Sequence, residues 1–326
     1  MWRPEMHPTF VLYACGSIQH HEWQGLEQWV RWYRSKMQDH HRLRLLLRAQ
    51  ALATHLARIL TTRTRPSGCL PQGITSTANA LDAGTYEGIN GWIVSWYRDD
   101  DKSVRVTFVN RARDTYRHAL LVYPHASDNF REVPGLVFDL TNIWQVGSGD
   151  DVGKVSSGVY SAAGYKYVIP QIRWYKWSSS FKFRHSYMAL DRTTTPDSLI
   201  VGEYQTSTSD PIRLVRYELD YTTRRLKTDS SGGVSKAVWA YCVNIERMQG
   251  AVSANGKFYL SRSNGASKGD LWAWVPGAAA KKNAGFYPRS PEDLSYDKRN
   301  GGRLYTVTEA EGVRYIINSP VNSVSF

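Results

Sequence analysis

Pro71-Gln72-Gly73-Ile74 returns twice in altered form, as Met248-Gln249-Gly250-Ala251 and as Pro291-Glu292-Asp293-Leu294. Each phrase is followed, after a small or polar stretch, by a run typical of a β-strand, at residues 92–96, 258–262 and 304–309. The step from Gln249 to Glu292 is 43 positions, and the step from Gln72 to Gln249 is 177, close to four such steps. A repeat of about 40–50 residues built from antiparallel strands is typical of a β-propeller blade.

Composition and turn residues also predict an all-β chain. Aromatic residues make up 13% of the 326 residues, including 12 Trp and 20 Tyr, and strands favour aromatic and β-branched side chains. Asn255-Gly256 and Asn300-Gly301-Gly302 are turn signals between strands. The predicted strands lie at residues 89–97, 104–109, 119–123, 165–169, 186–190, 199–204, 213–219, 237–243 and 257–261. We therefore expect one propeller of five or six blades over residues 69–326.

The first 68 residues differ from the rest. Between Glu22 and Leu60 there is no Pro and one Gly, and apolar residues recur at intervals of three and four, which predicts one or two amphipathic helices. We therefore expect a helical, basic N-terminal segment at residues 1–60 and a polar linker at residues 61–68. Three interpretations of the segment stay open: an arm that docks on a partner or an anionic surface, a cap or loosely ordered stretch beside the propeller, and a mispredicted start that replaces a signal peptide.

The basic charge does not indicate a nucleic-acid partner. The net charge is +12, and residues 1–68 carry ten Lys or Arg against four Asp or Glu, which is half of the excess. The remaining residues form an ordinary surface and show no basic-aromatic motif of a known nucleic-acid module. No segment reaches the roughly 18 apolar residues of a membrane span. We expect no nucleic acid, no transmembrane segment and a monomer.

The chain has three cysteines, Cys15, Cys69 and Cys242, too few for a disulfide scaffold and without the paired spacing of a zinc site. Cys69 and Cys242 both lie shortly before equivalent strands. The alternatives are a Cys69–Cys242 disulfide and two buried thiols.

A candidate ligand site follows from the propeller architecture. The innermost strand of each blade lines the central channel, so polar residues at matching positions of these strands converge in space. On this basis we expect the following side chains near one mouth of the channel: Gln72, Gln249, Glu292 and Asp293, joined by Gln171 and Glu203. A ring of amides and carboxylates suits sugar hydroxyls or a calcium ion, which takes six to eight oxygen ligands. The alternative is that these residues only bond neighbouring blades and backbone.

Two residues are candidates for a catalytic base. His185, in Phe183-Arg184-His185-Ser186-Tyr187, precedes a predicted strand and has a side chain that titrates near neutrality. Glu309 ends the strand that follows Pro291-Glu292-Asp293-Leu294. The chain has no Gly-x-Ser-x-Gly and no His-Glu-x-x-His motif, so esterase-type and zincin mechanisms have no support.

Several motifs in consistent order resemble a family of secreted β-propeller proteins of actinobacteria and fungi, largely without an assigned activity. The resemblance covers residues 69–320 and lies in these phrases: residues 69–75 (CLPQGIT), 135–140 (GLVFDL), 143–144 (IW), 164–171 (GYKYVIPQ), 197–204 (DSLIVGEY), 248–252 (MQGAV), 291–294 (PEDL) and 308–309 (TE). It implies a propeller and an extracellular location, and it transfers no catalytic residue. Between Pro134 and Gly135 this chain lacks roughly one hairpin that the relatives have, which implies an incomplete blade.

Taken together, the sequence predicts an extracellular β-propeller that binds a carbohydrate or another polar small molecule at the central channel. The alternative is a calcium-dependent propeller enzyme, namely a hydrolase, a lactonase or a polysaccharide lyase, with His185 or Glu309 as the base and calcium as the candidate cofactor. A third class is a protein-interaction scaffold that uses the propeller rim.

Overall fold

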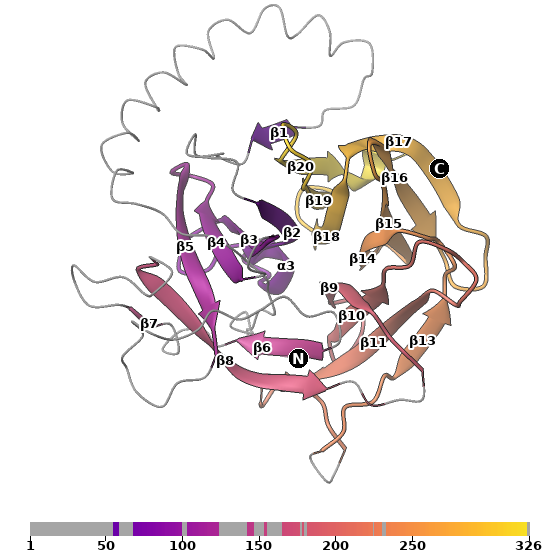
Figure 1. The fold of residues 1–326 in the computed structure, drawn as a ribbon, viewed down its shortest axis with the longest axis horizontal. Coiled ribbons are helices and arrows are strands. Elements are labelled where there is room, and N and C mark those ends of the chain that lie inside the picture. The colour runs from indigo at the N-terminus through magenta and orange to yellow at the C-terminus, as the bar shows by residue number, and fades with distance from the viewer. Residues whose placement is uncertain are drawn as a thin grey trace, which may run out of the picture.

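The computed structural model describes residues 55–58, 68–99, 103–123, 142–146, 153–154, 165–176, 178, 181–223, 225–229 and 233–324. These residues form four β-sheets around a common centre, with one short α-helix and one 3-10 helix (Figure 1). No helix among them is long and apolar enough to cross a membrane. The arrangement is that of a β-propeller, as predicted.

The first sheet starts with a four-stranded antiparallel meander and continues into three further strands. The meander consists of β2 (Cys69–Ser76), β3 (Gly91–Arg98), β4 (Val104–Asn110) and β5 (Thr115–Val122). The further strands are β6 (Asn142–Val146), β7 (Gly153–Lys154) and β8 (Tyr167–Lys176). β8 pairs in parallel with β5 and antiparallel with β6 and β7. The sequence predicted β8 but not this parallel pairing, and the proposed loss of a hairpin at Pro134 lies outside the described residues.

The other three sheets repeat the meander. The second holds β9 (His185–Asp191), β10 (Ser198–Glu203), β11 (Arg213–Asp220), β12 (Arg225–Leu226) and β13 (Trp239–Cys242). The third holds β14 (Met248–Ala254), β15 (Lys257–Asn264), β16 (Ser267–Trp274) and β17 (Lys281–Arg289). The fourth holds β18 (Pro291–Asp297), β19 (Arg303–Thr308), β20 (Tyr315–Pro320) and β1 (His55–Arg58). The 3-10 helix, Val321–Ser323, follows β20.

β1 corrects part of the N-terminal prediction. His55–Arg58 falls within the segment predicted to be helical, yet these four residues pair antiparallel with β20, from His55 opposite Asn318 to Arg58 opposite Tyr315. An edge strand leaves a row of unpaired backbone groups, and satisfying them outweighs a weak helical preference. The other residues of the predicted helix, 1–54 and 59–60, lie outside the described part of the chain.

Hairpin turns form where the sequence predicts them. Asn255 and Gly256 both have positive φ, 52° and 75°, and connect β14 to β15 with Ala254 opposite Lys257. Two-residue hairpin turns of this kind need positive φ at both positions, which Asn and Gly adopt most easily. Asn300, Gly301 and Gly302 have φ of 51°, 81° and 84° between β18 and β19.

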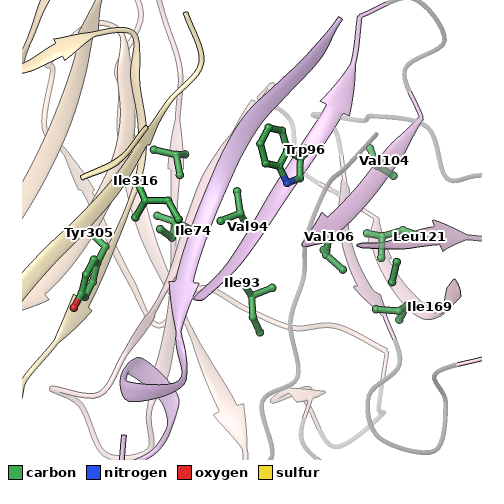
Figure 2. Packing of buried hydrophobic residues seen from close by; sticks show 12 residues of the cluster. Ile74, Ile93, Val94, Trp96, Val104, Val106, Leu121, Ile169, Tyr305 and Ile316 are labelled. Carbon is green, nitrogen blue, oxygen red and sulfur yellow. The ribbon is translucent and has the colours of Figure 1, made fainter. Parts of the chain in front are cut away.

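Apolar side chains fill the spaces between neighbouring sheets. Ile74 and Val94 of the first sheet are buried next to Ile316 and Tyr305 of the fourth (Figure 2). Because each sheet is covered on both faces, β3 reads as a nearly continuous apolar run instead of an alternating one. Separate clusters join the second, third and fourth sheets in the same way. Sheet-to-sheet packing of this kind holds the inner strands β2, β9, β14 and β18 close together.

The two cysteines that fall in described residues do not form a disulfide. Cys69 begins β2 and is half-buried, whereas Cys242 ends β13 and is exposed. The proposed Cys69–Cys242 bridge is therefore wrong for this structure, and the description of Cys242 as a buried thiol is wrong as well.

The loop after β2 contacts the loops after β9 and β18 at the end where the inner strands finish. Helix α3 (Thr77–Ala80) is buried, and Thr77 donates to the carbonyl of Gly84 at 2.8 Å. In the same loop Asp82 accepts from Arg192 at 2.8 Å and from Lys298 at 2.6 Å, so loops after β2, β9 and β18 meet there. Four of the predicted ligand residues lie at the opposite end, where the inner strands begin: Gln72, Gln249, Glu292 and Asp293.

Candidate functional site

Irregular strand pairing marks the three related phrases. Register shifts lie between Pro71 and Gly73 in β2, between Met248 and Gly250 in β14, and between Pro291 and Leu294 in β18. The residues inside these shifts are Gln72, Gln249, and Glu292 with Asp293. A β-bulge bends its strand and turns a side chain out of the regular alternation. The repeat seen in the sequence is therefore a repeated bulge that directs polar side chains to one end of the inner strands.

The glycine after each glutamine allows the inner strands to approach one another. A Cβ at Gly250 would lie 2.4 Å from the backbone N of Leu294 and 2.7 Å from the Cα of Asp293. A Cβ at Gly73 would lie 2.6 Å from Oγ of Ser95. Gly250 therefore sets the distance between β14 and β18, and so brings Gln249 beside Glu292.

Glu292 is the most buried acid of the cluster. Its side chain belongs to a residue only 2% exposed, and its backbone carbonyl accepts from Ser261 Oγ at 2.7 Å and Thr306 Oγ1 at 3.2 Å. Burial raises the pKa of Glu292 well above its ordinary value, and the charges of Glu309 and Asp293 raise it further, while a hydrogen bond from Gln249 opposes the shift. Its Oε1 has no hydrogen-bond partner in the described part of the chain.

Asp293 has a similar environment. Its Oδ2 accepts from the backbone N–H of Ile74 at 3.4 Å, which links β18 to β2. Burial raises the pKa of Asp293 well above its ordinary value, and backbone hydrogen bonds from Leu294 and Ile74 oppose the shift. Its Oδ1 is buried and, within the described ranges, has no hydrogen-bond partner. Glu292 and Asp293, which are adjacent in β18, thus each have one buried carboxyl oxygen without a hydrogen-bond partner among the described residues.

Glu309 joins the cluster from the second strand of the fourth sheet. It follows the end of β19, next to the start of β18, and its Oε2 accepts from Gln72 Nε2 at 2.7 Å. Burial raises the pKa of Glu309, and the hydrogen bond from Gln72 and the charge of Arg314 oppose the shift. Glu309 is half-buried, so it is the carboxyl of the cluster with access to solvent. We call Gln72, Gln249, Glu292, Asp293 and Glu309 the acid–amide cluster.

The acid–amide cluster has the chemistry of a polar-ligand site. A protonated carboxyl both donates and accepts, and an amide does the same, so each member can bond to a hydroxyl. No group of three or more His, Cys, Asp or Glu side chains suited to hold a metal ion occurs among the described residues. The described acids therefore give no support to the predicted calcium site.

Three predicted site residues lie elsewhere. Glu203 is fully buried, and its carboxylate accepts from Arg213 N at 2.9 Å, from the Arg213 guanidinium at 3.1 Å and from Arg184 N at 3.4 Å, so its bonds are structural. His185 is buried at the start of β9, opposite Glu203, with its ring 4.8 Å from that of Phe183. Gln171 lies on β8, which pairs with β5, β6 and β7, and no described contact connects it with the acid–amide cluster.

The sequence missed Ser186. Its hydroxyl donates to Gln249 Oε1 at 3.5 Å, so β9 contributes to the acid–amide cluster through Ser186 and not through its neighbour His185. Alternate residues of β9 are buried, namely His185, Tyr187, Ala189 and Asp191, which places Ser186 on the other face. Aligning the starts of the inner strands would have found it, because Ser186 stands where β14 has Gln249.

No protein-family model and no curated protein matches the chain. Among solved structures it is similar to the PQQ-bound aldose sugar dehydrogenase from Streptomyces coelicolor, with a TM-score of 0.39, 11% identity, and coverage of 82% of this chain and 99% of that one. It is also similar to a luciferin-regenerating enzyme, with a TM-score of 0.40, 10% identity, and coverage of 84% of this chain and 97% of that one. For a gluconolactonase from Xanthomonas campestris the TM-score is 0.34 and the identity 12%, with coverage of 83% of this chain and 98% of that one. Likenesses this weak carry no argument about activity, which is inferred from the geometry alone.

Proposed function

We propose that this chain is an extracellular β-propeller that binds a carbohydrate or another polar small molecule at the acid–amide cluster. The single observation that carries this function is the pair of buried carboxyl oxygens, Glu292 Oε1 and Asp293 Oδ1, that have no partner among the described residues. A buried polar atom without a partner costs about 1–3 kcal/mol. A ligand hydroxyl that bonds to both oxygens would offset that cost.

The protonation state of the two acids suits the hydroxyl groups of a saccharide. Because the pKa of Glu292 and that of Asp293 are both raised, these carboxyls hold protons at a higher pH than ordinary acids do. A protonated carboxyl donates one hydrogen bond and accepts others, which matches a sugar hydroxyl in both directions. Gln249 and Ser186 lie beside them and supply further donors and acceptors.

An enzyme is the second candidate. A general acid needs a pKa near the working pH, and the pKa of Glu309 is raised while its side chain keeps access to solvent. The charge of Glu309 raises the pKa of Glu292, as one carboxyl of an acid–base pair does to the other. The favoured reaction class is hydrolysis, lactone opening or polysaccharide lysis, with Glu309 in place of the buried His185 as the group that moves the proton.

The proposal also includes the number of blades and the division of the chain into domains. The strands β6, β7 and β8 lie between the β2–β5 meander and the second sheet (Figure 1), and we propose them as part of a fifth blade. We propose residues 69–326 as the propeller domain of a monomer, preceded by the segment 1–60 and the linker 61–68. A scaffold function through the rim would require that segment to be ordered against the propeller.

Binding to a panel of neutral and acidic oligosaccharides tests the function. We expect Gln249→Ala and Glu292→Ala each to weaken binding of the best ligand by about tenfold, or about 1.4 kcal/mol. Asn322→Ala and Glu311→Ala are matched controls, because both residues are exposed and stand outside the cluster. Unchanged affinity in the two cluster variants would remove this site. Product release in the same mixtures, lost in Glu309→Gln and kept in Glu311→Gln, would establish the enzyme instead.

A further inference from the structure

We propose that Arg184 and Arg247 form a cationic pair on the rim of the acid–amide cluster and that the ligand is an acidic saccharide with a carboxylate group. This inference rests on the proposed binding function and deepens it by naming the class of ligand. It is carried by two arginines at matching positions of adjacent sheets whose guanidinium groups form no ion pair within the described structure.

The two arginines are equivalent by register. Ser186 of β9 bonds to Gln249 of β14, so the two side chains face each other across the junction of the second and third sheets. Counting back one strand position from each gives His185 and Met248, which begin their strands. The next residue back is Arg184 in one sheet and Arg247 in the other. Each arginine therefore stands directly above its inner strand.

A short connection places both arginines on one stretch of rim. The guanidinium of Arg184 lies over the ring of Tyr204, 5.4 Å from its centroid. The next residue, Gln205, accepts at its carbonyl from the backbone N–H of Arg247 at 2.6 Å. Tyr204 and Gln205 thus join the two positions, and Tyr204 adds a half-buried aromatic face on which a sugar ring can stack.

The backbone of Arg247 is fixed in an uncommon conformation. Its φ is +58°, in the left-handed region that side chains other than Gly, Asn and Asp seldom adopt. Hydrogen bonds on both sides hold it there, since Arg247 N donates to Gln205 O and Arg247 O accepts from Ser263 N at 3.0 Å. Ser290 has the same position before β18 and the same sign of φ, 53°. The third and fourth sheets therefore share this conformation before their inner strands, and the third places a long cation on it.

Charge balance separates these two arginines from their neighbours. Arg213 is paired with Glu203 at 3.1 Å, and Arg262 is paired with Glu246 at 2.9 Å. No ion pair among the described residues involves Arg184 or Arg247, and none joins the exposed Asp210 of the following loop to either of them. Arg184 is exposed and Arg247 is half-buried, so neither residue is closed off from solvent.

An arginine pair selects for planar anions. The guanidinium offers parallel N–H donors that match the two oxygens of a carboxylate, and sulfate presents similar oxygens with a different shape. Below the rim, the carboxyls of Glu292 and Asp293 have raised pKa values, so they oppose an anionic ligand less than ordinary acids would. The site is therefore arranged with hydroxyl-binding groups at its floor and cations at its edge.

The test uses the full chain and three oligosaccharides of equal length: an oligogalacturonate, its neutral galactose counterpart, and a sulfated galactose oligomer without carboxylates. We expect the oligogalacturonate to bind about tenfold or more tightly than the neutral oligomer, and its affinity to fall as salt is raised. In the double variant Arg184→Gln/Arg247→Gln that preference should disappear while neutral binding stays. Lys182→Gln is the matched control, because Lys182 is an exposed cation two residues before Arg184.

The outcomes separate the cationic pair from the proposed binding function on which it rests. Equal binding of acidic and neutral oligomers, with both lost in Glu292→Ala, would overturn the cationic pair and leave the proposed function standing. A tighter sulfated ligand would overturn the choice of carboxylate. No binding of any oligomer by a protein that unfolds cooperatively would overturn the proposed function itself. A preference for the oligogalacturonate that survives in the double variant would assign it to other cations and overturn the pair.

Discussion

At the scale of single residues, the acid–amide cluster depends on two neighbouring acids that are buried in the folded protein. Glu292 and Asp293 are 2% and 7% exposed, and each keeps one carboxyl oxygen without a partner in the described residues. Burial favours the neutral form of an acid, so folding of these residues takes up protons. That links the stability of the fold to pH.

The sign of this linkage gives the first prediction. The folded pKa of Glu292 is above its unfolded value, so its contribution to stability is complete below about pH 4.3 and is lost as pH rises through the folded pKa. Each unit of that difference corresponds to about 1.4 kcal/mol. Glu292→Gln should therefore be more stable than the native chain at pH 8 and flatten the decline of melting temperature above pH 5.

Glu311→Gln is the control for this measurement, because Glu311 is exposed. The measurement is the melting temperature of the native chain, Glu292→Gln and Glu311→Gln between pH 4 and pH 9. A Glu292→Gln curve parallel to that of the native chain would show that Glu292 ionises normally in the folded state.

A second prediction concerns the bond between Gln72 and Glu309. The amide of Gln72 donates to Glu309 Oε2 at 2.7 Å and stabilises the charged carboxylate, which lowers its pKa. Gln72→Leu keeps a similar volume and removes the donor, so the pKa of Glu309 should rise further. Carboxyl-carbon NMR titration of Glu309 measures this directly. Asn322→Leu should leave that titration where it is, and an unchanged pKa in Gln72→Leu would mean that the bond does not form in solution.

At the scale of elements, the inner strands meet because of the glycines in their bulges. A Cβ at Gly250 would meet backbone atoms of Asp293 and Leu294, whereas a Cβ at Gly73 would meet first the side-chain oxygen of Ser95. Backbone atoms of a paired strand cannot move aside, but a serine hydroxyl can rotate to another rotamer.

The third prediction compares these two glycines. Gly250→Ala should destabilise the fold by about 1–3 kcal/mol, the usual cost of overpacking, and separate Gln249 from Glu292. Gly73→Ala should cost about 1 kcal/mol or less, because only Ser95 has to adjust. Urea unfolding of both variants gives the two free energies. Equal losses would contradict the close approach of β14 and β18.

The sequence predicted the positions of many strands but fewer of the pairings between them. The runs at residues 104–109, 199–204 and 213–219 became β4, β10 and β11 nearly as expected, because apolar strand residues between turn signals have few other solutions. The parallel pairing of β5 with β8 was not predicted, since it joins segments about 50 residues apart and leaves no local pattern. β1 was missed for the same reason, as its partner lies at the other end of the chain.

The residues of the candidate site were likewise predictable only in part. Gln72, Gln249, Glu292 and Asp293 were predictable, because the repeat gives equivalent positions directly. Glu203 was expected among the ligand residues, and the sequence does not reveal that Arg213 bonds to its carboxylate. Its role at a ligand site stays a prediction. Ser186 and Arg184 were missed, since the start of β9 has lost the Gln-Gly pair that marks β2 and β14. Arg247 was missed although Gln249-Gly250 stands shortly after it.

At the scale of the whole molecule, the fourth sheet joins the two ends of the described chain. β1 supplies its outer strand and pairs with β20, residue by residue, from His55 opposite Asn318 to Arg58 opposite Tyr315. Without β1, the backbone donors and acceptors on that side of β20 would form a free sheet edge.

The fourth prediction is therefore about truncation. A chain that begins at residue 61 lacks β1, whereas a chain that begins at residue 51 keeps it, so the pair differs by ten residues that include the strand. The shorter chain should melt several degrees lower and exchange the backbone amides of β20 faster, as measured by hydrogen exchange. Identical exchange in the two chains would show that β1 contributes nothing to the edge.

The pairing of β1 with β20 also has a consequence for how the protein is made. The two strands are separated by about 260 residues, and a ribosome adds about 5–20 residues per second. Residues 55–58 are therefore synthesised roughly 13–52 s before their partner. During that interval residues 55–58 lack the strand with which they pair, and the fourth sheet cannot be completed before β20 has been synthesised. Chaperones that bind extended segments have that interval in which to act.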